Sequence, residues 1–153
     1  MTTYEFAKTI HVLFAVIWVG GAATTQVFAT RLSRANEPRR MAAFAKDIEF
    51  VGTRVFTPAS VVVLAAGIWM VAISGWDFTD LWIVLGLIGI AFSATVGATF
   101  LGPESGRIGR LIEAKGPEDT EVAARLNRIF LVSRVELVIL LLIVINMVVK
   151  PGS

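Results

Sequence analysis

Four long apolar segments constrain this chain more than any other feature of its sequence. They cover residues 10–30, 55–74, 81–101 and 129–149, and each has about the 20 apolar residues that a helix needs to cross a bilayer. A segment in hydrocarbon must satisfy its own backbone hydrogen bonds, so each one is expected to be a helix. We therefore predict an all-α fold, an integral membrane four-helix bundle with cytoplasmic helical extensions, forming one domain over residues 1–153.

The composition supports a membrane protein. Hydrophobic residues make up 56% of the chain and charged residues 17%, against roughly 45–50% and about 25% in soluble domains. The chain has no cysteine, which excludes a disulfide framework, a thiolate metal site and haem attached through a CxxC motif. The basic residues lie in short loops rather than along one exposed face, so we expect the lipid bilayer as a partner and no nucleic acid.

Lysine and arginine are distributed unevenly among the loops. Most of them lie between the first and second segments and between the third and fourth, whereas the turn at residues 75–80 has none. The two ends contribute only Lys8 and Lys150. By the positive-inside rule, both long loops face the cytoplasm and both termini lie outside. We expect a multi-pass protein of the bacterial cytoplasmic (inner) membrane.

The first long loop is predicted to be helical. Asn36 can cap a helix, Pro38 suits its first turn, and apolar residues follow at helical spacing. This helix should continue into the second segment, with a bend at Pro58. Near the N-terminus, Thr2 and Glu5 match a capping box and predict where the first helix begins.

The second long loop is predicted to be broken at the Gly-Pro pairs of residues 102–103 and 116–117 and, between them, at Gly106 and Gly109. Between them, residues 107–115 suit a short helix. From Asp119 a helix should run into the fourth segment, with Glu121 and Arg125 as an i,i+4 pair.

Small residues recur in the third segment. Gly89, Ser93 and Gly97 are spaced four residues apart, and Gly86 lies in the same region. Such a row lets another helix approach closely. It predicts packing within the bundle or, as the alternative, a contact with a second copy or with a membrane partner protein; we expect a homo-oligomer or such a partner.

His11 is the only histidine, and it lies in the first apolar segment. A buried imidazole is costly, which makes it a candidate site residue and candidate metal ligand. Because successive spans run in opposite directions, His11 should lie level with Met70, Asn146 and Met147. These residues suit haem b or, as a second choice, copper. The structural alternative is a histidine bonded to Asn146 or to a backbone carbonyl, with the methionines filling gaps.

Three further residues of the first segment are candidates for a cofactor site. Trp18 follows His11 by seven residues, and Gly20 and Gly21 come next. The glycine pair either packs against another helix or admits a flat ligand such as a porphyrin.

A second group of polar residues lies deeper in the segments. Arg134 and Glu136 are about 200° apart on one helix, so each needs its own partner. Arg134 is expected to reach lipid headgroups, and Glu136 to meet Arg54 or Gln26. These groups either determine helix register or relay protons.

The stretch HVLFAVIWVGG, at residues 11–21, resembles the CopD/HemJ group of small bacterial membrane proteins. It is most similar to an uncharacterised branch of predicted integral membrane proteins of unknown function. The resemblance is strong over the first segment and extends, more loosely, to the layout of the four spans. It implies copper handling, or haem b binding with oxidation of protoporphyrinogen IX. In the haem-binding members a first-span histidine is a ligand, and His11 matches it.

The enzymes of that group also use a lysine in the third span. Residues 81–101 contain no lysine, so the resemblance does not carry protoporphyrinogen oxidase activity over to this chain. We therefore expect a protein that is not an enzyme. The leading hypothesis is a membrane protein that binds haem b through His11. The alternative is a non-enzymatic scaffold or accessory subunit, related to transport or copper handling. Proton-coupled transport through Glu136 is a weaker third hypothesis.

Overall fold

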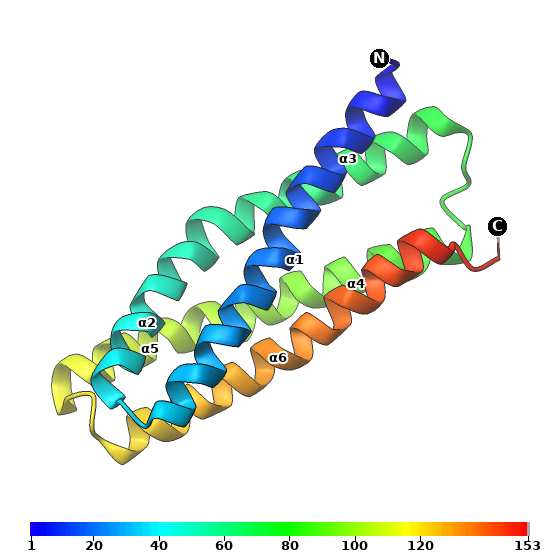
Figure 1. Cartoon of the computed structure of the whole chain (residues 1–153). Coiled ribbons are helices and arrows are strands. Elements are labelled where there is room, and N and C mark those ends of the chain that lie inside the picture. The colour runs from blue at the N-terminus through cyan, green and yellow to red at the C-terminus, as the bar shows by residue number, and fades with distance from the viewer. Residues whose placement is uncertain (153) are drawn as a thin grey trace.

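The computed structural model describes residues 1–152, and within them the chain is helical with no strand. It forms four long rods whose two termini lie at one end, while the α1–α2 and α5–α6 turns lie at the other (Figure 1). All four rods are long and apolar enough to cross a membrane, which confirms the predicted all-α membrane bundle. The elements are α1 (Thr3–Ala35), α2 (Pro38–Val51), η1 (Gly52–Phe56), α3 (Thr57–Ser74), α4 (Leu81–Val96), η2 (Gly97–Leu101), α5 (Gly102–Lys115) and α6 (Thr120–Val149).

The first helix is capped at both ends by residues suited to that role, through side chains at Thr2 and Glu5 and through the backbone at Asn36. Thr2 Oγ1 accepts from the Glu5 N–H at 3.1 Å and Glu5 Oε2 accepts from the Thr2 N–H at 2.7 Å, which confirms the capping box. Asn36 adopts a left-handed conformation with φ of 52° and ends α1. The prediction that Asn36 starts the next helix was therefore wrong. Asparagine tolerates the left-handed region, and α2 begins instead after Glu37, with Pro38 in its first turn.

A short π-helical segment precedes each of two prolines within the long helices, Pro58 and Pro103. In η1 the N–H of Thr57 donates to Gly52 O, and in η2 the N–H of Gly102 donates to Gly97 O. Each segment absorbs one extra residue. The proline that follows therefore enters the first turn of the next α-helix, where its missing N–H costs nothing.

This π-helical arrangement corrects one prediction and refines another. The predicted breaks at residues 102–103, at Gly106 and at Gly109 were wrong, because the helix runs without interruption from Leu81 to Lys115. The second rod is likewise continuous from Pro38 to Ser74, and its irregularity lies just before Pro58. The predicted break at Gly116, which has φ of +86°, is confirmed, as is the α6 start after Asp119.

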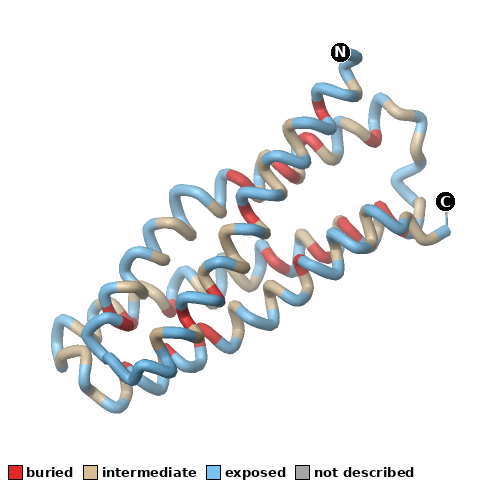
Figure 2. The backbone as a smooth tube through the Cα atoms, viewed as in Figure 1, coloured by how far each residue is buried: buried red, intermediate tan, exposed pale blue. Residues whose placement is uncertain are grey.

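The core is a series of small clusters between the rods rather than one large centre. α1 packs against α3 and α6, α4 packs against α6, and α2 packs against α5. Buried positions follow the inward faces, whereas most outward positions are exposed (Figure 2). Many large apolar side chains, such as Val16 and Leu142, are exposed on the outer faces, as expected for helices that face hydrocarbon.

The small residues of α4 face α6. A Cβ on Gly86 would overlap with Met147, and a Cβ on Gly89 would overlap with Ile143. Ser93 is 2% exposed. These three residues therefore pack within the bundle. Gly97, in contrast, has no such neighbour within 4 Å and begins η2.

An aromatic cluster joins the helices at the end of the bundle that carries the termini. The rings of Trp76 and Trp82 meet edge to face with centroids 5.4 Å apart. The ammonium of Lys150 lies 4.6 Å from the first ring centre and 5.0 Å from the second. Asn146 Nδ2 donates to the backbone oxygen of Trp82 at 2.7 Å. These contacts tie the end of α6 to the turn between α3 and α4.

Candidate functional site

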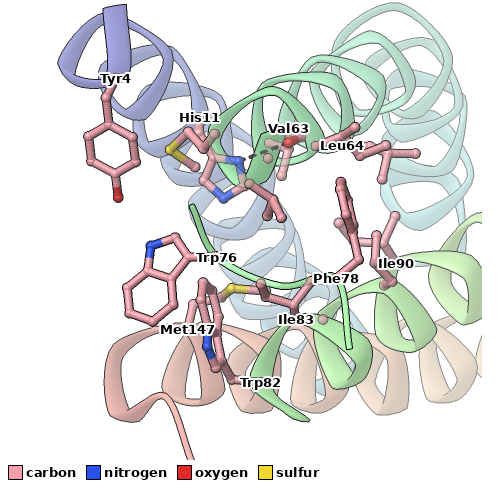
Figure 3. A pocket seen from close by; sticks show the side chains of 16 residues that line it. Tyr4, His11, Val63, Leu64, Trp76, Phe78, Trp82, Ile83, Ile90 and Met147 are labelled. Carbon is pink, nitrogen blue, oxygen red and sulfur yellow. Dashed lines mark hydrogen bonds between the residues drawn. The ribbon is translucent and has the colours of Figure 1, made fainter. Parts of the chain in front are cut away.

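A cavity of about 70 Å³ lies at the end of the bundle that carries the termini. It is formed by α1, α3, α4 and α6 and is partly open to the outside. Its wall is mostly apolar and includes the aromatic rings of Tyr4, Trp76, Phe78 and Trp82 (Figure 3). The structure thus encloses a small apolar space at the level of His11.

Three of the sequence-predicted site residues meet at this cavity. His11 lines it from α1, Met70 from α3 and Met147 from α6. All three side chains are partly buried. Residues predicted to lie at the same depth on three helices are therefore close together in the structure, although His11 and Met147 are 136 positions apart in the chain.

His11 is held in one tautomer by a backbone carbonyl. Its Nδ1 lies 2.8 Å from Val63 O on α3. Because a carbonyl oxygen only accepts, Nδ1 carries the proton, and in the neutral ring Nε2 then keeps its lone pair. Figure 3 shows the ring between α1 and α3, with its second nitrogen turned toward the cavity. Gly67 permits this position, because a Cβ there would approach the ring to 3.2 Å.

Asn146 does not bind His11. Its amide nitrogen is used by Trp82 O, so of the two structural partners considered for His11, the backbone carbonyl is the one observed. Trp82 Nε1 and Asn146 Oδ1 are buried without a hydrogen-bond partner in the protein. Buried polar groups are normally bonded, so the indole N–H of this cavity-lining residue is an unsatisfied buried donor.

Trp18, Gly20 and Gly21 are not brought to this cavity. Seven residues along a helix return to the same face about 10 Å further along the axis, which places Trp18 in the middle of the bundle. There it is 8% exposed and packs in a cluster with Val63 and Leu140. Gly21 lies against the ring of Phe56, and Gly20 has no such neighbour within 4 Å.

The second polar group is arranged differently from the prediction. Glu136 Oε1 accepts a 2.5 Å hydrogen bond from Ser93 Oγ on α4, so the predicted partners, Arg54 and Gln26, were wrong. The packing of α6 on α4 turns Glu136 toward α4. Arg54 is exposed in η1, and Gln26 on α1 is 8% exposed with its Oε1 unpaired.

Arg134 lies on another face of α6. Its guanidinium is exposed and lies 3.4 Å from the hydroxyl of Thr30 on α1. Arg134 and Glu136 therefore have separate partners, as their 200° separation predicts.

Sequence reasoning missed Val63 and Gly67. Both precede Met70 on the same face of α3, at i−7 and i−3. An antiparallel neighbour of His11 must present such a face, and a glycine within it marks where a bulky ring can approach. Helical periodicity applied backward from Met70 would have found both residues.

Metal binding at this site rests on one histidine. Within residues 1–152, no group of three or more His, Cys, Asp or Glu side chains is placed to hold a metal ion. Any metal here would be held by His11 Nε2 together with thioether sulfurs, or together with donor atoms of a cofactor that carries the metal.

A family model described as predicted integral membrane protein (DUF2269) matches residues 5–151. The chain belongs to this family. The match covers the His11 segment and the apolar part of every rod. Searches of curated proteins and of solved structures found no match.

Proposed function

We propose that this DUF2269 member binds haem b within the membrane, where His11 Nε2 would hold the iron. The observation that supports this proposal is the hydrogen bond from Nδ1–H to Val63 O, which in the neutral ring leaves Nε2 unprotonated and turned toward an apolar cavity. Histidines that bind metals nearly always donate their other ring N–H to a carbonyl or carboxylate, which fixes the tautomer and orients the ring.

The donors around His11 suit an iron porphyrin. Met70 and Met147 line the same cavity, and a thioether is an established haem ligand. The N–H of Trp82 is buried without a partner, so it could donate to an anionic substituent such as a propionate only after the ring moves. When bound, haem b supplies one-electron redox chemistry. His11 and the two methionines are the residues of the chain that would hold it.

The enclosed volume limits how haem b can bind. Pockets that enclose a ligand of this size measure roughly 300–1,000 Å³, whereas this cavity measures about 70 Å³. It does not enclose a whole macrocycle in this conformation. Because the cavity is partly open, the proposal requires a ligand that extends beyond the enclosed part. Oxidation of protoporphyrinogen is not proposed, because residues 81–101 contain no lysine.

The proposal includes a location. The excess of lysine and arginine at the α1–α2 and α5–α6 end favours that end for the cytoplasm. His11 then lies in the outer half of a bacterial cytoplasmic membrane. Reporters fused to the C-terminus test this orientation, and activity of a cytoplasmic reporter alone would overturn it.

The alternative function is a non-enzymatic scaffold or accessory subunit. The same hydrogen bond favours it in one respect, because it joins α1 to α3 and has a structural role with no ligand bound. Copper is a further alternative, with His11 and the two thioethers as a soft ligand set. The three hypotheses differ in what the purified protein carries.

An absorption spectrum of detergent-purified protein, expressed with ample haem, tests the proposal. We expect a Soret band that is lost in His11→Ala and changed in position or intensity in Met70→Leu or Met147→Leu. Met41→Leu is the matched control, because Met41 is buried in the cluster at the other end of the bundle, and its spectrum should equal that of the parent.

Two results would overturn haem binding at His11. One is folded, haem-free parent protein under these conditions, which favours the scaffold hypothesis. The other is an unchanged Soret band in folded His11→Ala. Retention of helical circular dichroism shows that each variant is folded, and metal analysis of the haem-free protein tests for copper.

A further inference from the structure

A second hollow lies at the opposite end of the bundle, between the end of α1 and the first half of α2. Its volume is about 490 Å³, within the roughly 300–1,000 Å³ range of ligand pockets. We call it the α1–α2 groove. Its lining residues are Phe28, Arg31, Leu32 and Ala35 from α1, and Arg40, Ala43, Phe44 and Asp47 from α2.

The groove combines an apolar floor with a basic rim. Phe28 is 48% exposed, and its ring centroid lies 6.4 Å from that of Phe44 across the two helices. Leu32 continues the apolar surface by one turn of α1. Arg31 and Arg40 line the same space from opposite helices. An occupant that satisfies both surfaces needs an apolar part and an anionic part.

The two arginines differ in how their charge is used. Arg31 makes no ion pair within residues 1–152. Arg40 pairs with Glu37 at 3.1 Å, but both side chains are well exposed, at 68% and 46%, and an exposed pair of this kind contributes little. The guanidinium of Arg40 can therefore turn to a stronger anion. Asp47 is the one acidic residue in the lining.

The position of the groove along the chain matches the boundary of a bilayer. The apolar segment of α1 ends at residue 30, and Arg31 follows at once. A bilayer whose hydrocarbon ends with this segment would place Phe28 level with acyl chains and Arg31 level with phosphates. Arginine binds phosphate in a bidentate manner, and basic residues beside a membrane span attract anionic lipid headgroups.

We propose that the α1–α2 groove binds an anionic phospholipid, with its phosphate on Arg31 and Arg40 and part of one acyl chain on Phe28, Leu32 and Phe44. The site is independent of haem binding, because it shares no lining residue with the His11 cavity. It makes the basic end of the bundle a specific lipid site rather than a generally charged surface.

Native mass spectrometry of the full chain in non-ionic detergent tests this site. Phosphatidylglycerol is titrated beside phosphatidylcholine and inorganic phosphate. The parent should bind phosphatidylglycerol in preference to phosphatidylcholine. Arg31→Gln and Arg40→Gln should each weaken that binding about fivefold, the effect expected for about 1 kcal/mol per basic residue. Arg34→Gln is the matched control, because it removes the same charge from the same turn but does not line the groove, and it should change binding less than twofold.

Ala43→Trp tests the acyl part of the proposal without changing charge. Ala43 is exposed and lines the groove, so an indole there occupies the space and should weaken lipid binding at least fivefold, while helical circular dichroism stays unchanged. Four results would each overturn the proposal. They are equal losses in Arg34→Gln and Arg31→Gln, equal binding of phosphatidylcholine, displacement of the lipid by millimolar phosphate (which would indicate a free-anion site), and undiminished binding in Ala43→Trp.

Discussion

Ser93 on α4 donates its hydroxyl hydrogen to Glu136 Oε1 on α6 over 2.5 Å. Ser93 is 2% exposed and Glu136 is partly buried, and Glu136 forms no ion pair within residues 1–152. The bond joins two apolar helices, which the hydrogen bond from Asn146 to Trp82 O also joins closer to the termini. The two bonds together select one register of α6 on α4.

Removing the donor of this bond should destabilise the bundle moderately. We expect Ser93→Ala to lower the free energy of unfolding by about 0.6 kcal/mol, the average for hydrogen bonds between membrane helices, with about 1.7 as an upper limit. Glu136→Gln keeps an acceptor oxygen and should cost less than Glu136→Ala. Unfolding in bicelles measures these values. Strict additivity of Ser93→Ala and Glu136→Ala would show that the two side chains are not coupled.

The glycines of α4 should respond to substitution according to their neighbours on α6. Gly89→Ala should cost about 1–3 kcal/mol, because its Cβ would overlap with the branched side chain of Ile143. Gly86→Ala should cost less, because it meets the flexible end of Met147. Gly20→Ala is the control. Gly20 has no such neighbour within 4 Å, so the higher helix propensity of alanine should stabilise the protein by up to about 1 kcal/mol. Thermal unfolding ranks the three, and a loss in Gly20→Ala equal to that in Gly89→Ala would contradict this order.

The buried carboxylate of Glu104 should be the most sensitive charged group at the α1–α2 end. Its side chain is 4% exposed and lies 2.8 Å from Arg125 Nη1 and 3.5 Å from Arg107 Nη1. Breaking a buried pair costs about 3–5 kcal/mol, and Arg125 is one-third exposed. We therefore expect Glu104→Ala to cost roughly 2–3 kcal/mol, below that range.

Glu113 offers a matched comparison for Glu104. It pairs with Lys46 at 3.5 Å with both side chains at least half exposed, and such pairs contribute about 0–1 kcal/mol. The urea midpoint of unfolding should therefore be clearly lower for Glu104→Ala than for Glu113→Ala. Equal midpoints would show that the burial of Glu104 does not add to its contribution to stability.

The turn between α3 and α4 should contribute a pH-dependent increment of stability. Hydrogen bonds from the backbone N–H and then the hydroxyl of Thr79 lower the pKa of Asp77. The folded state therefore keeps Asp77 ionised at pH values where the unfolded chain binds a proton. This stabilisation is present above about pH 3.9, the ordinary pKa of aspartate. It is lost as the pH falls through the lowered pKa of Asp77.

Asp77→Asn checks that sign. The melting temperature of the variant should be below that of the parent near neutral pH, and the difference should shrink as the pH falls below about 4. Thr79→Val removes the hydroxyl bond and keeps the backbone bond, so part of the pH dependence should persist. A difference that grows on acidification would mean that the pKa of Asp77 is raised.

The π-helical segments show a signal that was present in the sequence but not used. Gly52 precedes Pro58 by six residues, and Gly97 precedes Pro103 by the same spacing. A glycine six residues before a proline leaves room for one i→i+5 turn, which reconciles the missing N–H with a continuous helix. The Gly-Pro pair at residues 102–103 favours a break only when it is considered without this spacing.

Depth was predictable from the sequence, and rotation about each helix axis was not. His11, Met70 and Met147 meet because span length and direction determine how far each residue lies from the bundle end. Trp18 does not join them because it lies two turns further along the axis. Glu136 was assigned to Gln26 or Arg54 by depth alone, yet it faces Ser93.

The sequence by itself determined the four spans, the Thr2 cap, the start of α6 and the level of the His11 site. These follow from local hydrogen bonding and from the cost of leaving polar groups in hydrocarbon, which act on each segment separately. Only the tertiary structure decided that His11 binds Val63 O and that Glu136 binds Ser93. Those choices depend on how α3 and α4 turn their glycines toward α1 and α6, because close approach between two helices is a property of both surfaces.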